Sequence, residues 1–184
     1  MADLFPRVGA FALGYRVAEV EEYFHEARSA YEQPGTADDL AAIDVRRASF
    51  DLKRGGYSTA AVDSALDRLE VAFAVRVRER YVKQHGQDAW MAELAHRAQA
   101  LYPRLRRPAG QRFATPPTLR TGYDRTEVDA VMDRLTAFFD QGKPLTAEDI
   151  RALTFKRRRS WAAYEERVVD AYLARAVDIL LGVA

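Results

Sequence analysis

The sequence predicts an all-α protein in which short extended or hairpin-like arms precede the helices. Apolar residues recur at helical spacing along most of the 184-residue chain, and no alternating run bounded by turn residues fits a strand better than a helix. A motif centred on tyrosine also occurs four times. Repetition of this kind indicates an internally duplicated fold.

Each expected helix is a run of apolar side chains on one face that ends at turn residues. The first begins near Val17 and ends at Gln33-Pro34-Gly35, and the second begins near Ser58 and ends at Gly86. Asp124 is expected to cap the N-terminus of a later helix. The remaining expected helices cover residues 88–101, 127–139 and 164–181.

The repeated motif is a tyrosine with valine five residues later, an acid six residues later and a large apolar residue nine residues later. Positions five and nine share one helical face, and the acid lies beside it. Glycine precedes three of the tyrosines, which predicts a turn of positive φ before the helix. These mainly structural positions are Gly14, Tyr15, Val20 and Glu21; Gly56, Tyr57, Val62 and Asp63; Gly122, Tyr123, Val128 and Asp129; and Tyr164, Val169 and Asp170.

The residues before each tyrosine divide the four copies into two kinds. Two copies, here called repeats A, have phenylalanine ten residues earlier, at Phe5 and Phe113. The other two, repeats B, open with the similar stretches LAAIDVRRASF (40–50) and LTAEDIRALTF (145–155), each expected to form a short helix and a loop. The order A, B, A, B indicates a duplicated pair. The expected organisation is a first pair with an extra helix in 1–103, a solvated basic linker in 104–112, and a second pair in 113–184.

A phenylalanine arm, a Gly-Tyr turn and then Val-Asp-x-x-Leu on a helix resemble the N-terminal domain of the DivIVA family, the polar and septal scaffolds of Gram-positive bacteria. The clearest instance is the second repeat B, with LTAEDIRALTF and VVDAYL. Repeats A look like the abbreviated copies in actinobacterial proteins that carry several such motifs. The resemblance implies a cytoplasmic, non-enzymatic scaffold or adaptor for cell division or polar growth. It also implies protein partners, self-association and peripheral attachment to the inner membrane face at the septum or poles.

The resemblance further implies which loops touch an anionic phospholipid surface. In the family, an aromatic residue and an arginine before Gly-Tyr insert among the lipids. The aromatic position falls on Ala12, Arg54, Arg120 and Trp161, so only Trp161 retains it, and the arginine position falls on Leu13, Gly55, Thr121 and Ala162. No apolar heptad run is long enough for the family's oligomerising coiled coil. The candidates for membrane or partner contact are Leu13, Lys53, Arg54, Arg120, Arg157, Arg158, Arg159 and Trp161.

The stretch FKRRRSWAAY, residues 155–164, has three interpretations. Its arginines cap helix carbonyls and Trp161 packs between the two halves, or Trp161 anchors the loop in a membrane whose anionic lipids attract the bases. The third interpretation is a nucleic-acid patch, but no helix-turn-helix, RNA-recognition or zinc-finger signature accompanies the basic run. Binding of nucleic acid is therefore not expected.

Composition and motifs give no support to catalysis. The chain has net charge +1 and no cysteine, its three histidines lie far apart, and no phosphate loop, nucleophile elbow or dinucleotide fingerprint occurs. We therefore expect no catalytic residue, metal, cofactor or small-molecule substrate. No stretch is long and apolar enough for a membrane span. The alternative to the scaffold is a soluble helical interaction module without membrane affinity, and a nucleic-acid binder is the third hypothesis.

Overall fold

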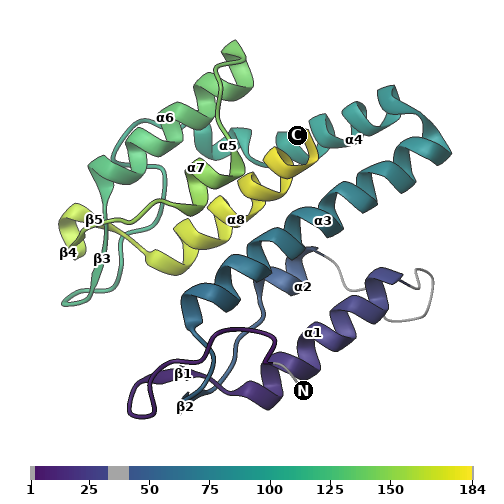
Figure 1. Cartoon of the computed structure of the whole chain (residues 1–184). Coiled ribbons are helices and arrows are strands. Elements are labelled where there is room, and N and C mark those ends of the chain that lie inside the picture. The colour runs from purple at the N-terminus through teal and green to yellow at the C-terminus, as the bar shows by residue number, and fades with distance from the viewer. Residues whose placement is uncertain (1–2, 33–41, 184) are drawn as a thin grey trace. The chain divides into compact units, whose positions relative to one another are not determined.

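The computed structural model describes residues 3–32 and 42–183 of the chain (Figure 1). The described part is mostly helical, as predicted, and it divides into two compact units, Met1–Glu79 and Arg80–Ala184. The division falls inside one long helix. It therefore differs from the expected organisation, in which residues 104–112 separate the two halves.

The first unit pairs two long helices through two short strands. Strand β1 (Leu13–Tyr15) leads into α1 (Val17–Glu32), and after α2 (Ala42–Arg46) the strand β2 (Leu52–Arg54) leads into α3 (Thr59–His85), whose last residues belong to the second unit. The strands β1 and β2 are antiparallel, with Leu13 opposite Arg54 and Tyr15 opposite Leu52. Tyr57 adds a further antiparallel bridge to Tyr15.

The second unit begins with a helical segment and then repeats the order of elements seen in the first. The opening helices are α4 (Gln87–Gln99) and α5 (Tyr102–Leu105). The repeated part comprises β3 (Thr121–Asp124), α6 (Arg125–Gln141), α7 (Ala147–Arg151), β4 (Arg157–Arg159), the 3-10 turn η1 (Ser160–Ala162), β5 (Ala163–Tyr164) and α8 (Glu166–Val183). Strand β3 lies between β4 and β5, antiparallel to both.

The predicted helix ends have identifiable causes. Asp124 caps α6 as expected, because its carboxylate accepts from the backbone N–H groups of Thr126 and Glu127. A capping box between Thr146 and Asp149 starts α7, and Gly142 ends α6 in the left-handed conformation. These local signals explain why α6 and α7 begin and end where they do.

The extended arms form strands, which the sequence did not predict. Each strand has only two to four residues, and so short a run cannot show the alternation that identifies a strand. What holds each strand is backbone pairing with a segment far along the chain, such as Gly122 opposite Arg158. The expectation of helices preceded by short arms holds, and the arms pair to form two small sheets.

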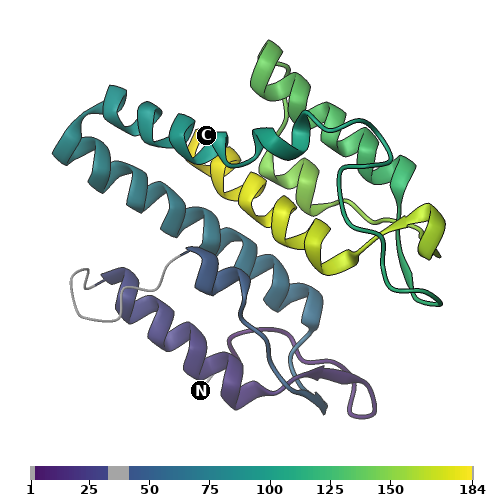
Figure 2. The same ribbon diagram turned by 180° about the vertical axis from the view of Figure 1, so that it is seen from behind.

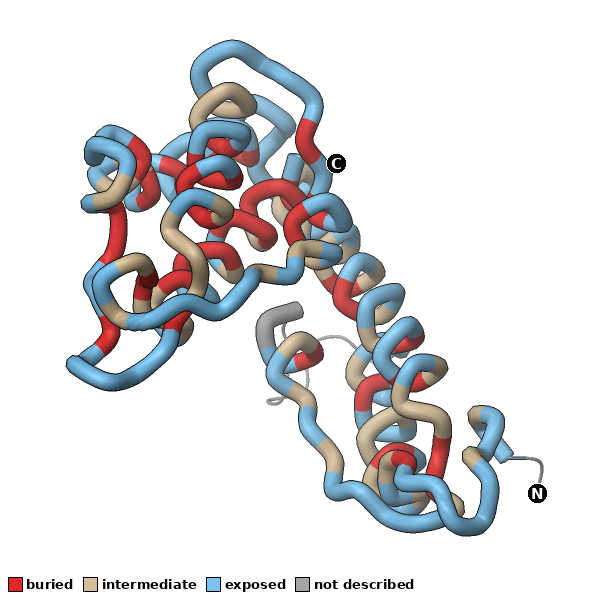
Figure 3. Tube along the Cα trace, turned by 90° about the vertical axis from the view of Figure 1, so that its left-hand side faces the viewer, coloured by how far each residue is buried: buried red, intermediate tan, exposed pale blue. Residues whose placement is uncertain are grey.

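The cores of the two units differ in completeness. In the first unit Val20, Tyr57 and Val62 are buried, and around them Phe5 and Phe24 are only partly buried. In the second unit nine residues of α8 are buried. Figure 3 shows many buried positions, coloured red, in that unit. Helix α4 contacts α8, and α5 contacts α6. Both ribbon views show α4 and α5 beside these helices (Figures 1 and 2).

Candidate functional site

The four motif tyrosines meet in pairs, one pair in each unit. In the first unit Tyr15 and Tyr57 exchange backbone hydrogen bonds, each of 2.9 Å from N to O. In the second, Tyr123 lies opposite Tyr164 where β3 pairs with β5. A tyrosine of repeat A therefore always lies against a tyrosine of repeat B, and this pairing positions the loops before both.

The side chains of each pair cross between the repeats. The Tyr57 hydroxyl donates to Glu21 over 2.7 Å, and the Tyr164 hydroxyl donates to Asp129 over 3.0 Å. Glu21 and Asp129 are the acids of the partner repeats A. In the opposite direction, Tyr15 is hydrogen-bonded to Asp63 and Tyr123 to Asp170, the acids of repeats B. Each tyrosine thereby holds the first turns of the helix that follows the other tyrosine.

These tyrosines remain protonated donors at neutral pH. Burial raises the pKa of Tyr57 and Tyr164 above the ordinary value, and the hydrogen bonds to Glu21 and Asp129 raise it further. Burial, followed by the charge of Asp170, raises the pKa of Tyr123. The pKa of Asp170 is itself raised by burial and partly restored by its bond to Tyr123. The motif acids are therefore structural acceptors for the crossing tyrosines.

The glycines before the tyrosines are required by close backbone approach. Gly14, Gly56 and Gly122 lack the positive φ that the sequence suggested, which instead occurs at Gly55. A Cβ at Gly14 would lie 2.3 Å from the carbonyl oxygen of Tyr57, and one at Gly122 would lie 2.1 Å from that of Tyr164. The expected turn is thus corrected: glycine is needed because the paired strands touch there.

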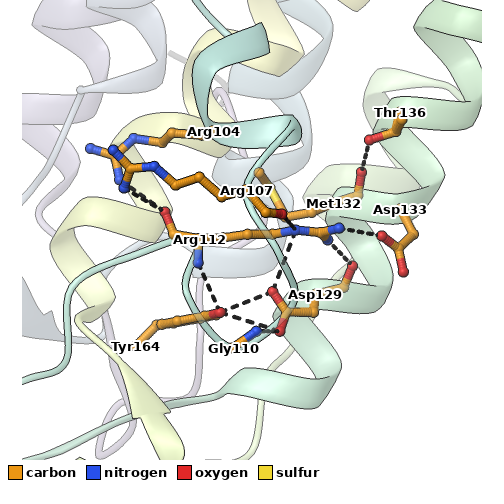
Figure 4. Close-up of polar contacts among 9 residues, drawn as sticks. All are labelled: Arg104, Arg107, Gly110, Arg112, Asp129, Met132, Asp133, Thr136 and Tyr164. Carbon is orange, nitrogen blue, oxygen red and sulfur yellow. Dashed lines mark hydrogen bonds and ion pairs between the residues drawn. The ribbon is translucent and has the colours of Figure 1, made fainter.

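Arg112 ties the basic segment 104–112 into the second unit (Figure 4). Its guanidinium donates to the carbonyl oxygen of Asp129 over 2.7 Å and to the carboxylate of Asp133 over 2.5 Å, and its backbone N–H donates to the Tyr164 hydroxyl over 3.1 Å. Both Arg112 and Leu105 are buried. The segment was expected to be a solvated connector, and this prediction is wrong because Leu105 and Arg112 pack inside the unit.

The loops before the paired tyrosines form one exposed tip in each unit. The first tip comprises residues 8–13 and 52–55, where Phe11 is 90% exposed and Leu13 also projects into solvent. Lys53 and Arg54 are exposed beside them on β2. Within the described residues, no carboxylate forms an ion pair with either cation. The tip therefore combines unburied apolar side chains with free positive charge.

The second tip, residues 115–121 and 157–162, has the same character. Leu119 is 98% exposed at a positive φ of 70°, and Trp161 on η1 is 70% exposed. Arg157 pairs with Glu166 and Arg158 pairs with Asp124, so these two cations stabilise the loop. Arg120 and Arg159 have no carboxylate partner among the described residues, and Arg159 lies over the Trp161 ring at 5.9 Å.

The structure brings the predicted contact residues together within each unit. Leu13 lies opposite Arg54, and Thr121, next to Arg120, lies opposite Arg159. The sequence reasoning missed Phe11 and Leu119, because it considered only the positions at which the family carries its aromatic residue and arginine. A signal was present in both loops: each is a single large apolar residue among small or polar neighbours, in VGAFA and PPTLR.

Comparison with known proteins finds no family model, curated protein or solved structure that matches the chain. Within the described ranges, His, Asp and Glu side chains do not gather into a group able to hold a metal ion. None of the helices in that part of the chain is long and apolar enough to cross a membrane.

The cap at Asp124 gives a pH-dependent prediction. The Arg158 guanidinium, together with two backbone N–H groups, lowers the pKa of Asp124 below 3.8. Because the pKa of Asp124 is lower in the folded state than the unfolded value of 3.8, the charged carboxylate stabilises the fold fully above pH 3.8. This stabilisation is lost as the pH falls through the lower pKa of the folded state. We expect Asp124→Ala to reduce the free energy of unfolding by about 1 kcal/mol at neutral pH, with the deficit shrinking in acid. Urea unfolding of both proteins at neutral pH and in acid measures the difference in free energy of unfolding.

Asp67→Ala is the control, because Asp67 is exposed on α3 and caps no helix. Its effect should stay within about 0.5 kcal/mol at either pH. An Asp124→Ala deficit that is the same in acid as at neutral pH would contradict the role of the charged carboxylate.

Proposed function

We propose that this protein is a non-enzymatic adaptor of the DivIVA type that binds an anionic membrane surface through its two tips. It acts in the cytoplasm on the inner membrane face, at the septum or poles, during cell division or polar growth. The observation that carries the proposal is the pairing of unburied apolar side chains, Phe11, Leu119 and Trp161, with cations that have no carboxylate partner in the described residues.

Both kinds of residue at the tips gain free energy at an anionic lipid surface. Phe11 and Leu119 expose nearly their whole side chains to water, and burying one such side chain is worth about 2 kcal/mol. A basic residue near an anionic surface contributes about 1 kcal/mol. One tip alone binds weakly and reversibly, whereas two tips in one chain can add their contributions when both engage the same membrane.

The order of elements supports the internal duplication that the DivIVA-like repeats imply. Strand, long helix, short helix, strand and long helix follow one another in both units, in the same order as repeats A and B in the sequence. The bonds between the repeats also correspond: Glu19 accepts from the backbone N–H of Asp51, and Glu127 accepts from that of Lys156. We propose that the chain arose by duplication of a DivIVA-like pair. In each unit, repeats A and B then take the places that two chains occupy in a dimer.

Removal of the apolar tip residues should weaken membrane binding. The triple variant Phe11→Ser, Leu119→Ser and Trp161→Ser is expected to bind vesicles of phosphatidylglycerol and phosphatidylethanolamine at least about tenfold more weakly, because the largest exposed apolar side chains of both tips are gone. The measurement is co-sedimentation with the vesicles.

Charge reversal at Lys53, Arg54 and Arg120 should abolish the preference for anionic over phosphatidylcholine vesicles.

The matched control removes exposed apolar residues away from the tips. Val75→Ser and Val77→Ser on α3 with Met91→Ser on α4 remove side chains that are also exposed in the wild type and should leave sedimentation unchanged. Equal loss of binding in the control and tip variants, or no binding of the wild type to anionic vesicles, would remove the membrane from the proposed function.

A further inference from the structure

An apolar groove of about 970 Å³ runs along α1 in the first unit. Its apolar lining includes Leu4, Phe5, Phe24, Tyr31 and Leu69. Leu4 is 55% exposed and Tyr31 is also exposed, so the apolar lining is open to solvent. From Ala18 to Tyr31 the groove follows α1 for about 20 Å, the length of a helix of about four turns.

The second unit shows what covers the equivalent surface there. The two units match motif by motif, so that Phe5 corresponds to Phe113 and Tyr31 to Phe139. Helix α5 lies on both of these residues: Arg104 stacks over the Phe113 ring at 5.1 Å, and the Tyr102 ring lies 6.0 Å from that of Phe139. The surface that is an open groove in the first unit is therefore the seat of a helical segment in the second.

Further contacts fix this covering segment along its length. The carbonyl oxygen of Leu101 accepts from the Tyr172 hydroxyl over 2.9 Å, and Trp90 of α4 donates to the carbonyl oxygen of Gly182 over 2.9 Å. Under this cover Met132 is fully buried, whereas its counterpart Phe24 in the groove is only partly buried. The described residues of the first unit include no segment equivalent to α4 and α5.

The charged residues of the groove indicate the sign of its occupant. Glu21, Glu22, His25 and Arg28 line it, and Arg28 is already paired with Glu32. Within the described residues no cation forms an ion pair with Glu22. In the second unit the counterpart of Glu21 is Asp129, and the positive charge beside it comes from Arg112. The Arg112 guanidinium donates to the Asp129 carbonyl oxygen and lies 3.7 Å from the Asp129 carboxylate. An arginine or lysine on the occupant satisfies the groove in the same way.

We propose that the groove binds one basic amphipathic helix of a partner protein, with its apolar side on Phe5, Phe24 and Tyr31 and a basic residue opposite Glu22. The mode is the helix-in-groove recognition in which apolar anchors spaced along one face enter a preformed channel. The inference deepens the adaptor role and rests on it, since it names the kind of protein that the adaptor carries.

The chain supplies its own probe for the test. A synthetic, fluorescently labelled peptide of residues 87–112 has the chemistry that covers the equivalent surface, with five arginines against two acids. Fluorescence anisotropy with the full chain should show saturable binding. Leu4→Ser and Glu22→Lys should each weaken binding of the peptide about tenfold. Leu4→Ser removes an apolar contact, and Glu22→Lys removes the acid that faces a basic residue of the peptide. Both positions are exposed, so neither substitution disturbs the core.

Matched controls change the same chemistry outside the groove. Leu52→Ser replaces an equally exposed leucine, and Glu26→Lys reverses an exposed acid on α1 that does not line the groove. Both should keep the wild-type affinity for the peptide. Absence of binding overturns the inference. Wild-type affinity in both Leu4→Ser and Glu22→Lys also overturns it, because the peptide then binds outside the groove.

Two further readouts separate the inference from its alternatives. Sedimentation equilibrium that shows self-association of the wild type, lost in Leu4→Ser and Glu22→Lys, would overturn it in favour of a second copy as occupant. The tip variant with Phe11, Leu119 and Trp161 replaced should keep its affinity for the peptide. Loss of vesicle binding with peptide binding intact, or the reverse, therefore shows which of the two proposals has failed.

Discussion

Replacement of Arg112 by methionine is expected to lower the free energy of unfolding by about 3 kcal/mol. The Arg112 side chain lies almost wholly inside the second unit and donates to the Asp129 carbonyl oxygen and the Asp133 carboxylate. Without the guanidinium the buried carboxylate of Asp129 loses its nearby positive charge, and the desolvation cost of that carboxylate is no longer offset. Urea unfolding of the full chain, followed by circular dichroism, measures the loss.

Arg106→Met is the control for this prediction. Arg106 lies in the same basic segment but is exposed, with its guanidinium over the Tyr102 ring at 5.3 Å. Its replacement should change the free energy of unfolding by about 0.5 kcal/mol or less. Equal effects of the two substitutions would mean that segment 104–112 is the solvated connector that its composition suggests.

Gly122→Ala is expected to cost a similarly large amount, about 3 kcal/mol, although it adds a single methyl group. The new Cβ would lie 2.1 Å from the carbonyl oxygen of Tyr164, an atom of the backbone that no side-chain rotation can move away. Either β3 and β5 separate, which breaks the pairing of Tyr123 with Tyr164, or the chain bends with loss of hydrogen bonds. Thermal and urea unfolding should both show the loss.

Gly9→Ala is the same substitution at a glycine of the first tip. A Cβ there would meet no atom within 4 Å, and Gly9 does not have a positive φ. We therefore expect a change of about 0.5 kcal/mol or less, in either direction. If Gly122→Ala were as harmless as Gly9→Ala, the close approach of the two strands would not exist in solution.

The helices of this protein could be predicted because their signals are local. Val20 and Phe24 lie four residues apart on one face of α1, and Asp124 begins α6 with a side-chain cap. The strands could not be predicted because each is too short to show a pattern and is formed by pairing with a distant segment. The reason for Gly122 likewise depends on Tyr164, 42 residues further along the chain, and no periodicity contains that information.

The candidate site was predictable to a similar degree. The loops before Gly-Tyr were identified from the repeat, and Lys53 and Arg54 are exposed on β2 in one of them, while their contact with a membrane or partner stays a prediction. Phe11 and Leu119 were missed because only the positions of the family's aromatic residue and arginine were considered, and these two residues lie beside those positions. Arg112 was assigned to solvent because a basic run suggests exposure until Asp129 and Asp133 are found on the facing helix.

The crossing hydrogen bonds of the tyrosines have a consequence for how such a chain can evolve. Tyr57 satisfies Glu21 and Tyr15 satisfies Asp63, so a solitary copy of the motif would present an acid and a hydroxyl whose counterparts do not exist. Repeats A and B are therefore inherited together, as one pair. Lineages that descend from this protein should gain or lose copies two at a time, and an odd copy number should be found only where a second polypeptide supplies the missing half.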